Sequence, residues 1–358
     1  MQHRTLRRCA AAGVALSLAL PMAPTAARPR RDQRVAAAAR YLASNQADTG
    51  AVTGGFSQFG TTADAVLAWT AARRGERQID RAMAWLEDNV DEATTLGLKS
   101  KLLIAVATTG GDTRSFGGHD LVQEIRDTKT DQGQYGGESD TEVGYHALAM
   151  IALEAARVDR PQDAIDWLRD AQCDDGGWQF DEPSSANDDE HCFDSTAEND
   201  FARSDTNTTA YASIALSGTP DAQPEHDPFE FFRSARDEYK RGWVYDPHGK
   251  CTEETLGKEF CYLTDANSTA LALMAYQAAG EEIPRAGEYA LMDLQYRLCG
   301  KRMGAFAFSW TYDPDTERFR KDGPNVGATV AAVPPIVRWT FGVDYEVTRP
   351  VPPRRPCR

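Results

Sequence analysis

The 358-residue sequence lacks an internal apolar run long enough to cross a membrane as a helix. Residues 9–23 are apolar but too few for a span, and they follow a basic start that contains Arg4, Arg7 and Arg8 and no acid. This order is typical of a secretory signal peptide, with Thr25 and Ala27 as the small residues at the cleavage site. We therefore expect residues 1–27 to be removed, no membrane span in the mature chain, and an extracellular location.

An excess of positive charge is also missing. The chain has 54 Asp and Glu against 39 Lys and Arg, which gives a formal net charge of -15. Such a balance argues against nucleic acid as a partner. The acidic run at 188–190 is expected to be solvated loop surface rather than a cation site.

Metal-binding cysteine patterns are absent too. The sequence holds no C-x-x-C pair, and His191 beside Cys192 is a weak zinc signal, so no metal and no other cofactor is predicted. Cys9 belongs to the signal peptide, and the six remaining cysteines of an exported chain predict three disulfides. The spacing leaves the connectivity open, but neighbour pairing closes the long loops and ties down the tail: Cys173 with Cys192, Cys251 with Cys261, and Cys299 with Cys357.

What the sequence does contain is a repeat. DTNTTAYASIAL from Asp205 and DANSTALALMAY from Asp265 both place Asp, Asn and Thr at alternate positions before an Ala-rich apolar run. The spacing of the copies is typical of an array of helical hairpins. Looser copies begin at Gln58, Thr95, Asp140 and Asn325.

Each copy predicts a helix start, because its first side chain can accept hydrogen bonds from the amides of the first turn. The Ala-rich helices suit a crowded inner ring, and an amphipathic outer helix is expected before each one. The outer helices are predicted at 35–44, 79–89, 121–128, 164–171, 229–239 and 286–296.

The sequence therefore predicts an all-α fold, an α/α toroid of six helical hairpins with inner and outer helix rings. It covers residues 28–345 and is followed by an extended Pro-rich tail at 346–358. Long loops are expected at 180–204 and 245–264, which hold three of the cysteines, Cys192, Cys251 and Cys261. An open superhelix is the alternative arrangement.

Residues 167–178 read WLRDAQCDDGGW, in which Gln172, Gly176 and Trp178 have the spacing Q-x-x-x-G-x-W. This segment resembles the QW repeat of squalene and hopene cyclases and related prenyltransferase-type toroids, and weaker copies occur near Gln46, Tyr135 and Gln295. The resemblance implies a terpenoid cyclase or protein prenyltransferase type of α/α toroid. We expect the glutamine to bind amides of the next inner helix and the aromatic ring to stack in the turn, which is a structural role.

Protonating cyclases of this superfamily carry a D-x-D-D-T-A motif whose middle Asp is the acid. In the matching segment 205–210, Asn207 stands in place of the acid and Thr208 in place of its partner, and Asn267 repeats the change. An amide cannot donate a strong-acid proton. No carboxylate cluster for magnesium and diphosphate is visible either. The sequence leans against catalysis, and no catalytic residue is assigned.

Secreted toroids that bind rather than react, such as the cobalamin carriers, are similar at these helix starts. We therefore expect a ligand-binding or scaffold module for a small hydrophobic or polar molecule, with an active terpene cyclase or prenyltransferase-type enzyme as the alternative. The candidate residues at the cavity mouth, whose alternative role is helix capping alone, are Gln58, Asp140, Glu142, Asp205, Asn207, Asp265, Asn267 and Asn325.

A third class is a toroid carbohydrate-active enzyme, a lyase or a hydrolase. Its candidate acids and bases are Asp140, Glu142, Tyr145 and His146, with Arg203 as a neutraliser of charge. His146 is followed by apolar residues, which favours a core histidine. The oligomeric state is not predicted.

Overall fold

The computed structural model describes residues 27–137, 140–181, 192, 202–218, 222–258, 261–339, 341 and 349–353. The predicted signal peptide, apart from Ala27, and the end of the tail lie outside these residues. Among the described residues, none of the helices is both long and apolar enough to span a bilayer.

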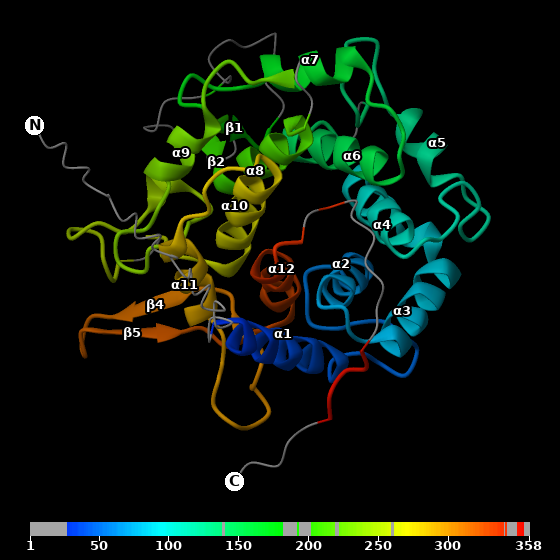
Figure 1. Ribbon diagram of the computed structural model, residues 1–358. Helices are drawn as coiled ribbons and strands as arrows, with labels where there is room; N and C mark the ends of the chain where they lie inside the picture. The colour runs from blue at the N-terminus through cyan, green and yellow to red at the C-terminus, as the bar shows by residue number, and fades with distance from the viewer. Residues whose placement is uncertain are drawn as a thin grey trace, which may run out of the picture.

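One set of helices forms an inner ring. Each packs against the next along the chain, and the last also packs against the first, so the ring is closed rather than an open superhelix (Figure 1). Each contains a fully buried alanine, from Ala63 in the first to Ala332 in the last, because small side chains let adjacent helices approach closely. The inner helices are α2 (Gln58–Ala71), α4 (Leu96–Thr108), α6 (Val143–Ala155), α8 (Thr206–Leu216), α10 (Ala266–Ala278) and α12 (Val326–Val337).

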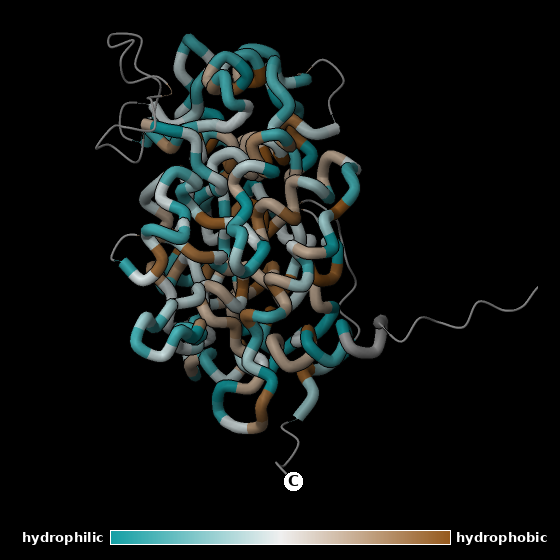
Figure 2. The backbone as a smooth tube through the Cα atoms, turned by 90° about the vertical axis from the view of Figure 1, so that its left-hand side faces the viewer, coloured by the Kyte–Doolittle hydropathy of each residue, from teal (hydrophilic) through white to brown (hydrophobic). Residues whose placement is uncertain are grey.

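The other helices lie outside this ring, each against its inner neighbours. They are amphipathic, and the hydrophobic residues visible in a perpendicular view lie mainly within the body of the toroid (Figure 2). The predicted helix-rich toroid is confirmed. The outer helices are α1 (Ala27–Ala43), α3 (Glu76–Asp88), α5 (Leu121–Arg126), α7 (Gln162–Asp170), α9 (Pro228–Ser234) and α11 (Arg285–Asp293).

The all-α prediction missed short strands. The largest pairing is an antiparallel hairpin of β4 (Trp310–Asp313) and β5 (Arg318–Lys321), which projects beside α11. Its aromatic and β-branched residues flank a turn at Pro314, which is a local strand signal. The other elements are the strand pairs β1 (Trp178–Gln179) with β2 (Ser204–Asp205) and β3 (Phe306–Ala307) with β6 (Pro324–Asn325), and the one-turn helices Val90–Glu92 and Pro247–Gly249.

A recurring hydrogen bond joins the turn before an inner helix to that helix. The amide of Trp178 donates to Oγ1 of Thr209 at 2.9 Å, and the amide of Trp243 donates to Oγ1 of Thr269 at 3.0 Å. The last Thr of the repeat thus fixes the preceding turn. The same bond runs from Val52 to Thr62, from Phe306 to Thr329 and, with a histidine ring nitrogen as acceptor, from Tyr135 to His146.

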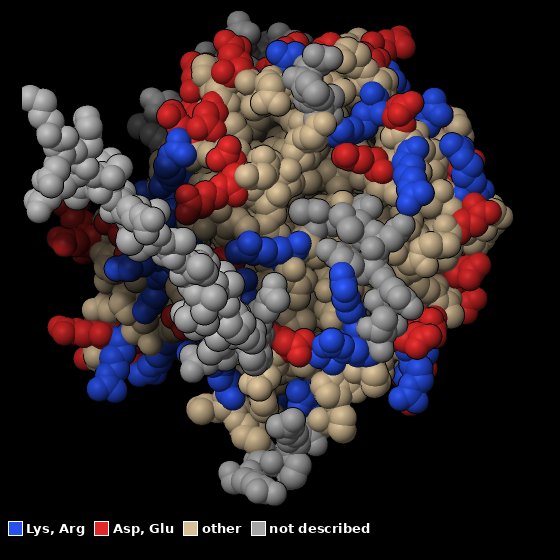
Figure 3. Space-filling model, viewed as in Figure 1, with Lys and Arg blue, Asp and Glu red and all other residues tan. Residues whose placement is uncertain are grey.

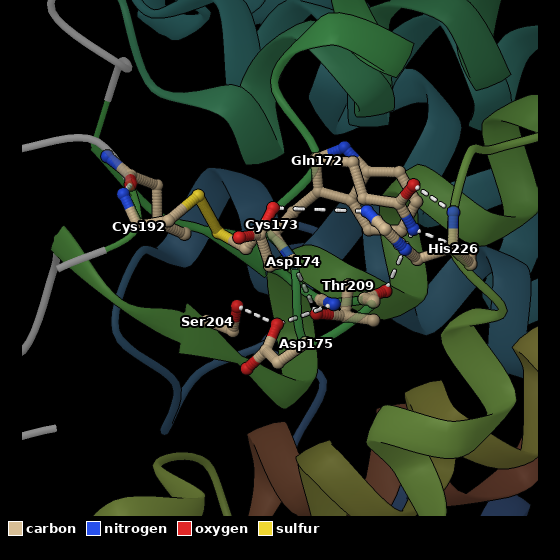
Figure 4. The surroundings of a disulfide bond; sticks show 12 residues. Gln172, Cys173, Asp174, Asp175, Cys192, Ser204, Thr209 and His226 are labelled. Atoms are coloured by element: carbon tan, nitrogen blue, oxygen red, sulfur yellow. Dashed lines mark hydrogen bonds and ion pairs between the residues drawn. A yellow bond between two sulfur atoms is a disulfide. The ribbon is translucent and has the colours of Figure 1, made fainter. Parts of the chain in front are cut away.

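Gln172 connects two outer helices. Its Nε2 donates to the carbonyl of Gly176 at 3.1 Å and to that of His226 at 2.8 Å, and its Oε1 accepts from the amide of His226 at 2.9 Å (Figure 4). His226 precedes α9, so the expected contact with an inner helix was wrong, because the end of α7 lies beside the start of the next outer helix. Gln46 and Gln295 make the same kind of link, to Gln78 of α3 and to Arg34 of α1.

Two of the predicted disulfides are confirmed, Cys173 with Cys192 and Cys251 with Cys261. The first attaches residue 192 to the turn that holds Gln172 (Figure 4). Cys299 is disulfide-bonded as well, but Cys357 lies outside the described residues, so that third pairing stays a prediction.

Candidate functional site

The ring encloses two adjoining cavities of about 270 and 410 Å³. They share one wall, made by the starts of α2, α4 and α8. Figure 3 shows Lys and Arg side chains interspersed with Asp and Glu side chains over one face of the toroid. The shared lining residues are Ser57, Leu98, Lys101, Asn207 and Tyr211.

Apolar side chains make most of the remaining lining. The smaller cavity lies against Leu67, Leu271, Met274, Val330 and Trp339, and the larger one against Tyr145, Leu148, Phe180 and Tyr245. A concave, mainly apolar space with a few polar groups is the usual form of a small-molecule site.

The lining follows the repeat. In α8 the cavity residues include Asn207 and Tyr211, and in α10 they include Asn267 and Leu271. They are four residues apart because one helical turn advances 3.6 residues and returns to the same face. Gly60 with Asp64, Gly97 with Lys101, and Gly327 with Ala331 are the matching pairs in α2, α4 and α12.

In α6 the lining pair is Gly144 and Leu148, so the repeat there counts from Glu142 and not from Asp140. Asp140 binds a different helix: its Oδ2 accepts from the amide of Leu96 at the start of α4, at 2.9 Å. Glu142 is not a lining residue, and burial raises the pKa of its carboxyl.

Asp64 and Lys101 are the charged groups on the described part of the cavity wall. Lys101 Nζ donates to Asp64 Oδ2 at 2.8 Å. Burial opposes the charge on Lys101, but the carboxylate of Asp64 and smaller contributions from Tyr211 and Tyr145 leave the pKa of Lys101 above its ordinary value. The ammonium therefore stays protonated and is not an amine nucleophile near neutral pH.

Asn207 and Asn267 both line the smaller cavity. The Oδ1 atom of each is buried and has no hydrogen-bond partner among the described residues. A buried carbonyl oxygen without a partner is costly, so these two atoms mark positions where a ligand has a hydrogen bond to gain.

Two other predicted mouth residues, Asp205 and Asp265, are helix caps. Asp205 Oδ1 accepts from the amides of Asn207 and Thr208 at 2.8 and 2.9 Å, and Asp265 Oδ1 accepts from Ser268 at 2.8 Å. Burial raises the pKa of Asp205 to about 7 and that of Asp265 to about 6. Neither lines the cavity.

Two further candidates, Asn325 and Gln58, lie at the starts of α12 and α2 and differ in their roles. Asn325 Oδ1 accepts from the amide of Ala328 at 2.8 Å and so caps α12. Gln58 is exposed, and Ser57 caps α2 in its place by accepting from Gly60 at 3.2 Å.

The candidate acids and bases for carbohydrate chemistry do not converge. His146 is fully buried behind the inner ring, where Nδ1 accepts from the Tyr135 amide and Nε2 faces the Ala164 carbonyl at 3.1 Å. Burial lowers the pKa of His146 to about 3, so it is a neutral core histidine. Arg203 forms a buried ion pair of 2.5 Å with Asp246, and of this group Tyr145 alone lines a cavity.

Sequence reasoning missed Asp64, Lys101 and Tyr211. The signal was present in the repeat, because each lies six residues after the first position of its copy, in the midst of an apolar helix. A polar residue at that position points to the centre if the ring is closed and hollow, and the sequence alone left both conditions open.

No family model matches the chain, and no curated protein does either. Solved structures do match it over most of both chains. A variant of the type II terpene cyclase MstE from Scytonema, in complex with geranylgeranyl dihydroxybenzoate, has 13% identity and a TM-score of 0.55 and covers 87% of this chain and 97% of its own.

Two further solved structures are similar as well. A possible GH105 member from Salmonella enterica has 12% identity and a TM-score of 0.56, covering 90% of this chain and 97% of its own. The GH76A alpha-1,6-mannanase from Salegentibacter has 11% identity and a TM-score of 0.52, covering 86% and 98%. The chain therefore has the α/α-toroid fold that terpene cyclases and toroid glycoside hydrolases share.

Proposed function

We propose that this protein is a secreted toroid of six helical hairpins that binds a small, largely apolar molecule in its central cavity without converting it. The observation that carries the proposal is the Asp64 and Lys101 pair. Asp64 is the one acidic residue among the described lining residues, and its carboxylate accepts a hydrogen bond from the Lys101 ammonium at 2.8 Å. A carboxylate that is paired with an ammonium carries no proton to donate to an alkene.

A terpene cyclase is the alternative function. The matched cyclase structure supports the idea that a toroid of this shape accommodates an isoprenoid. In this chain the position of the expected acid is Asn207, which faces the cavity, and the neighbouring Thr208 carries no acid either. The lining residues therefore support ligand binding better than they support a protonating cyclase.

A glycosidase is less well supported. Hydrolysis of a glycosidic bond generally uses two carboxyl groups that flank the scissile bond. The described cavity wall offers Asp64 and no second carboxyl group. The buried aspartates Asp205 and Asp265 cap helices, while Asp246 pairs with Arg203 and Asp237 accepts a hydrogen bond from Thr264.

The test is incubation of the purified mature protein with squalene, geranylgeranyl diphosphate, a corrinoid and an acidic polysaccharide. Binding is followed by tryptophan fluorescence, since Trp339 lines the cavity, and products by mass spectrometry. We expect saturable binding of an apolar compound that is recovered unchanged. Turnover of any of these compounds would contradict the proposal. Secretion is tested separately, by finding Arg28 as the first residue of the protein in culture medium.

A further inference from the structure

We propose that the ligand of the central cavity carries an anionic group, a carboxylate or a phosphate, which binds Lys101 while the apolar part of the ligand fills the smaller cavity. This inference rests on the proposed binding function and specifies the chemistry of the ligand.

The ammonium of Lys101 has hydrogen-bonding capacity to spare. It has three N–H donors, and Asp64 Oδ2 is its one hydrogen-bond acceptor among the described residues. Lys101 lines both cavities, so its remaining N–H donors can reach a ligand bound there. The Lys101 side chain is 30% exposed, and an anionic acceptor is the group that satisfies its remaining donors best.

The two charged groups on the described cavity wall balance each other. Asp64 accounts for one negative charge opposite one positive charge, so the pair itself is neutral. The residues Ser57, Thr95 and Asn207, at the starts of three inner helices, border the larger cavity next to Lys101. Carboxyl groups already accept hydrogen bonds from the first amides of α4 and α8, so the capacity to bind an anion comes from the unused donors of Lys101.

Asn207 supplies a second contact to the same group. It lines both cavities, as Lys101 does, and lies one turn before Tyr211 on α8. Rotation about the terminal side-chain bond exchanges the amide oxygen and nitrogen, so Asn207 either accepts from a ligand hydroxyl or donates to a ligand oxygen.

The apolar part of the ligand has a separate place. Beyond Lys101 the wall of the smaller cavity is made by Leu67, Leu271, Met274, Val330 and Trp339. These side chains offer no charge and few hydrogen bonds, so this part of the cavity favours the hydrocarbon part of a ligand. A polar end at Lys101 and an apolar end here define an amphipathic ligand.

The experiment compares matched probes that differ in the head group alone. Palmitic acid is paired with cetyl alcohol, and farnesoic acid and farnesyl phosphate are paired with farnesol. We expect the acids or the phosphate to bind at least about tenfold more tightly than the alcohols, since a hydrogen bond to a charged group contributes roughly 1.5–3 kcal/mol. The relative affinities of farnesoic acid and farnesyl phosphate show which anion is preferred.

Lys101→Met is expected to abolish the discrimination while the alcohols still bind. Lys99→Met is the matched control, because Lys99 lies on the same helix and also forms an ion pair of 2.8 Å, with Glu124 away from the cavity. It should leave the preference unchanged. Asp64→Asn provides the opposite change: it removes the competing carboxylate and should strengthen binding of the acids.

The outcomes separate this inference from the function on which it rests. If acids and alcohols bind the unaltered protein equally well, or if Lys101→Met keeps the preference for acids, the anion site is refuted and the binding function stands. If none of the probes binds, and squalene and the corrinoid do not bind either, the binding function itself fails. Circular dichroism of each variant shows whether the fold is retained.

Discussion

Asp64 of α2 and Lys101 of α4 form an ion pair of 2.8 Å between two adjacent inner helices, on the wall of the central cavity. Their side chains are 28% and 30% exposed, which reflects contact with the cavity. The pair therefore links the packing of the ring to the chemistry of the site.

Removal of one partner should destabilise the protein more than removal of both. Asp64→Leu leaves a partly buried ammonium without its carboxylate, and we expect a loss of about 1–2 kcal/mol, less than for a fully buried pair because solvent screens the charges. The double variant Asp64→Leu with Lys101→Met should recover part of that loss. Urea denaturation of the four proteins of the cycle measures the coupling, and strictly additive losses would contradict it.

The hydroxyl of Thr269 should stabilise the fold. Thr269→Val keeps the shape of the side chain but removes the acceptor of the Trp243 amide, which is buried. An unpaired buried amide costs about 1–3 kcal/mol. Thr269→Ser keeps the hydroxyl and should lose less. Equal stability of the valine variant and the unaltered protein in urea titrations would show that the bond is not needed.

Stability should fall as the pH rises from about 4 to about 7. Burial raises the pKa of Asp205 to about 7 and that of Asp265 to about 6, so in this range the folded state binds more protons than the unfolded state. Asn is an equally good helix cap and does not titrate. Asp205→Asn should therefore be more stable than the unaltered protein near pH 8, with the advantage lost near pH 4.

Urea unfolding over the pH series gives the comparison. The double variant Asp205→Asn with Asp265→Asn should show the smallest change of unfolding free energy with pH. A stability that climbs with pH over the same range, in the protein with both aspartates, would show that these carboxyl groups are solvated.

Gly176→Ala should be strongly destabilising. Gly176 has φ +85°, and an added Cβ would lie 2.7 Å from the carbonyl oxygen of Asp227. Gly110→Ala is the control, because Gly110 has φ +76° but open space around the added atom. We expect about 1–2 kcal/mol for the control, from the left-handed backbone alone, and about twice that for Gly176→Ala. Similar losses in thermal unfolding would mean that the contact with Asp227 relaxes freely.

Much of the fold was predictable because it depends on local patterns. The alternate Asp, Asn and Thr residues at 205–209 and 265–269 predicted helix starts, and the first residues of both copies are caps in the structure. The hairpin at 310–321 was missed because strand signals are short and context-dependent. The register at Asp140 was misassigned, since Asp140 and Glu142 both suit a helix start and the tertiary contact with Leu96 decides between them.

The sequence by itself determined the helical repeat and the helix caps at Asp205 and Asp265, because each depends on residues close together in the chain. Tertiary structure alone decided that the ring closes and that Asp64 meets Lys101 inside it. A repeat fixes which face of a helix turns inward. Closure of the ring decides which residues of different helices meet there, and the size of the inward side chains decides whether a cavity remains between them.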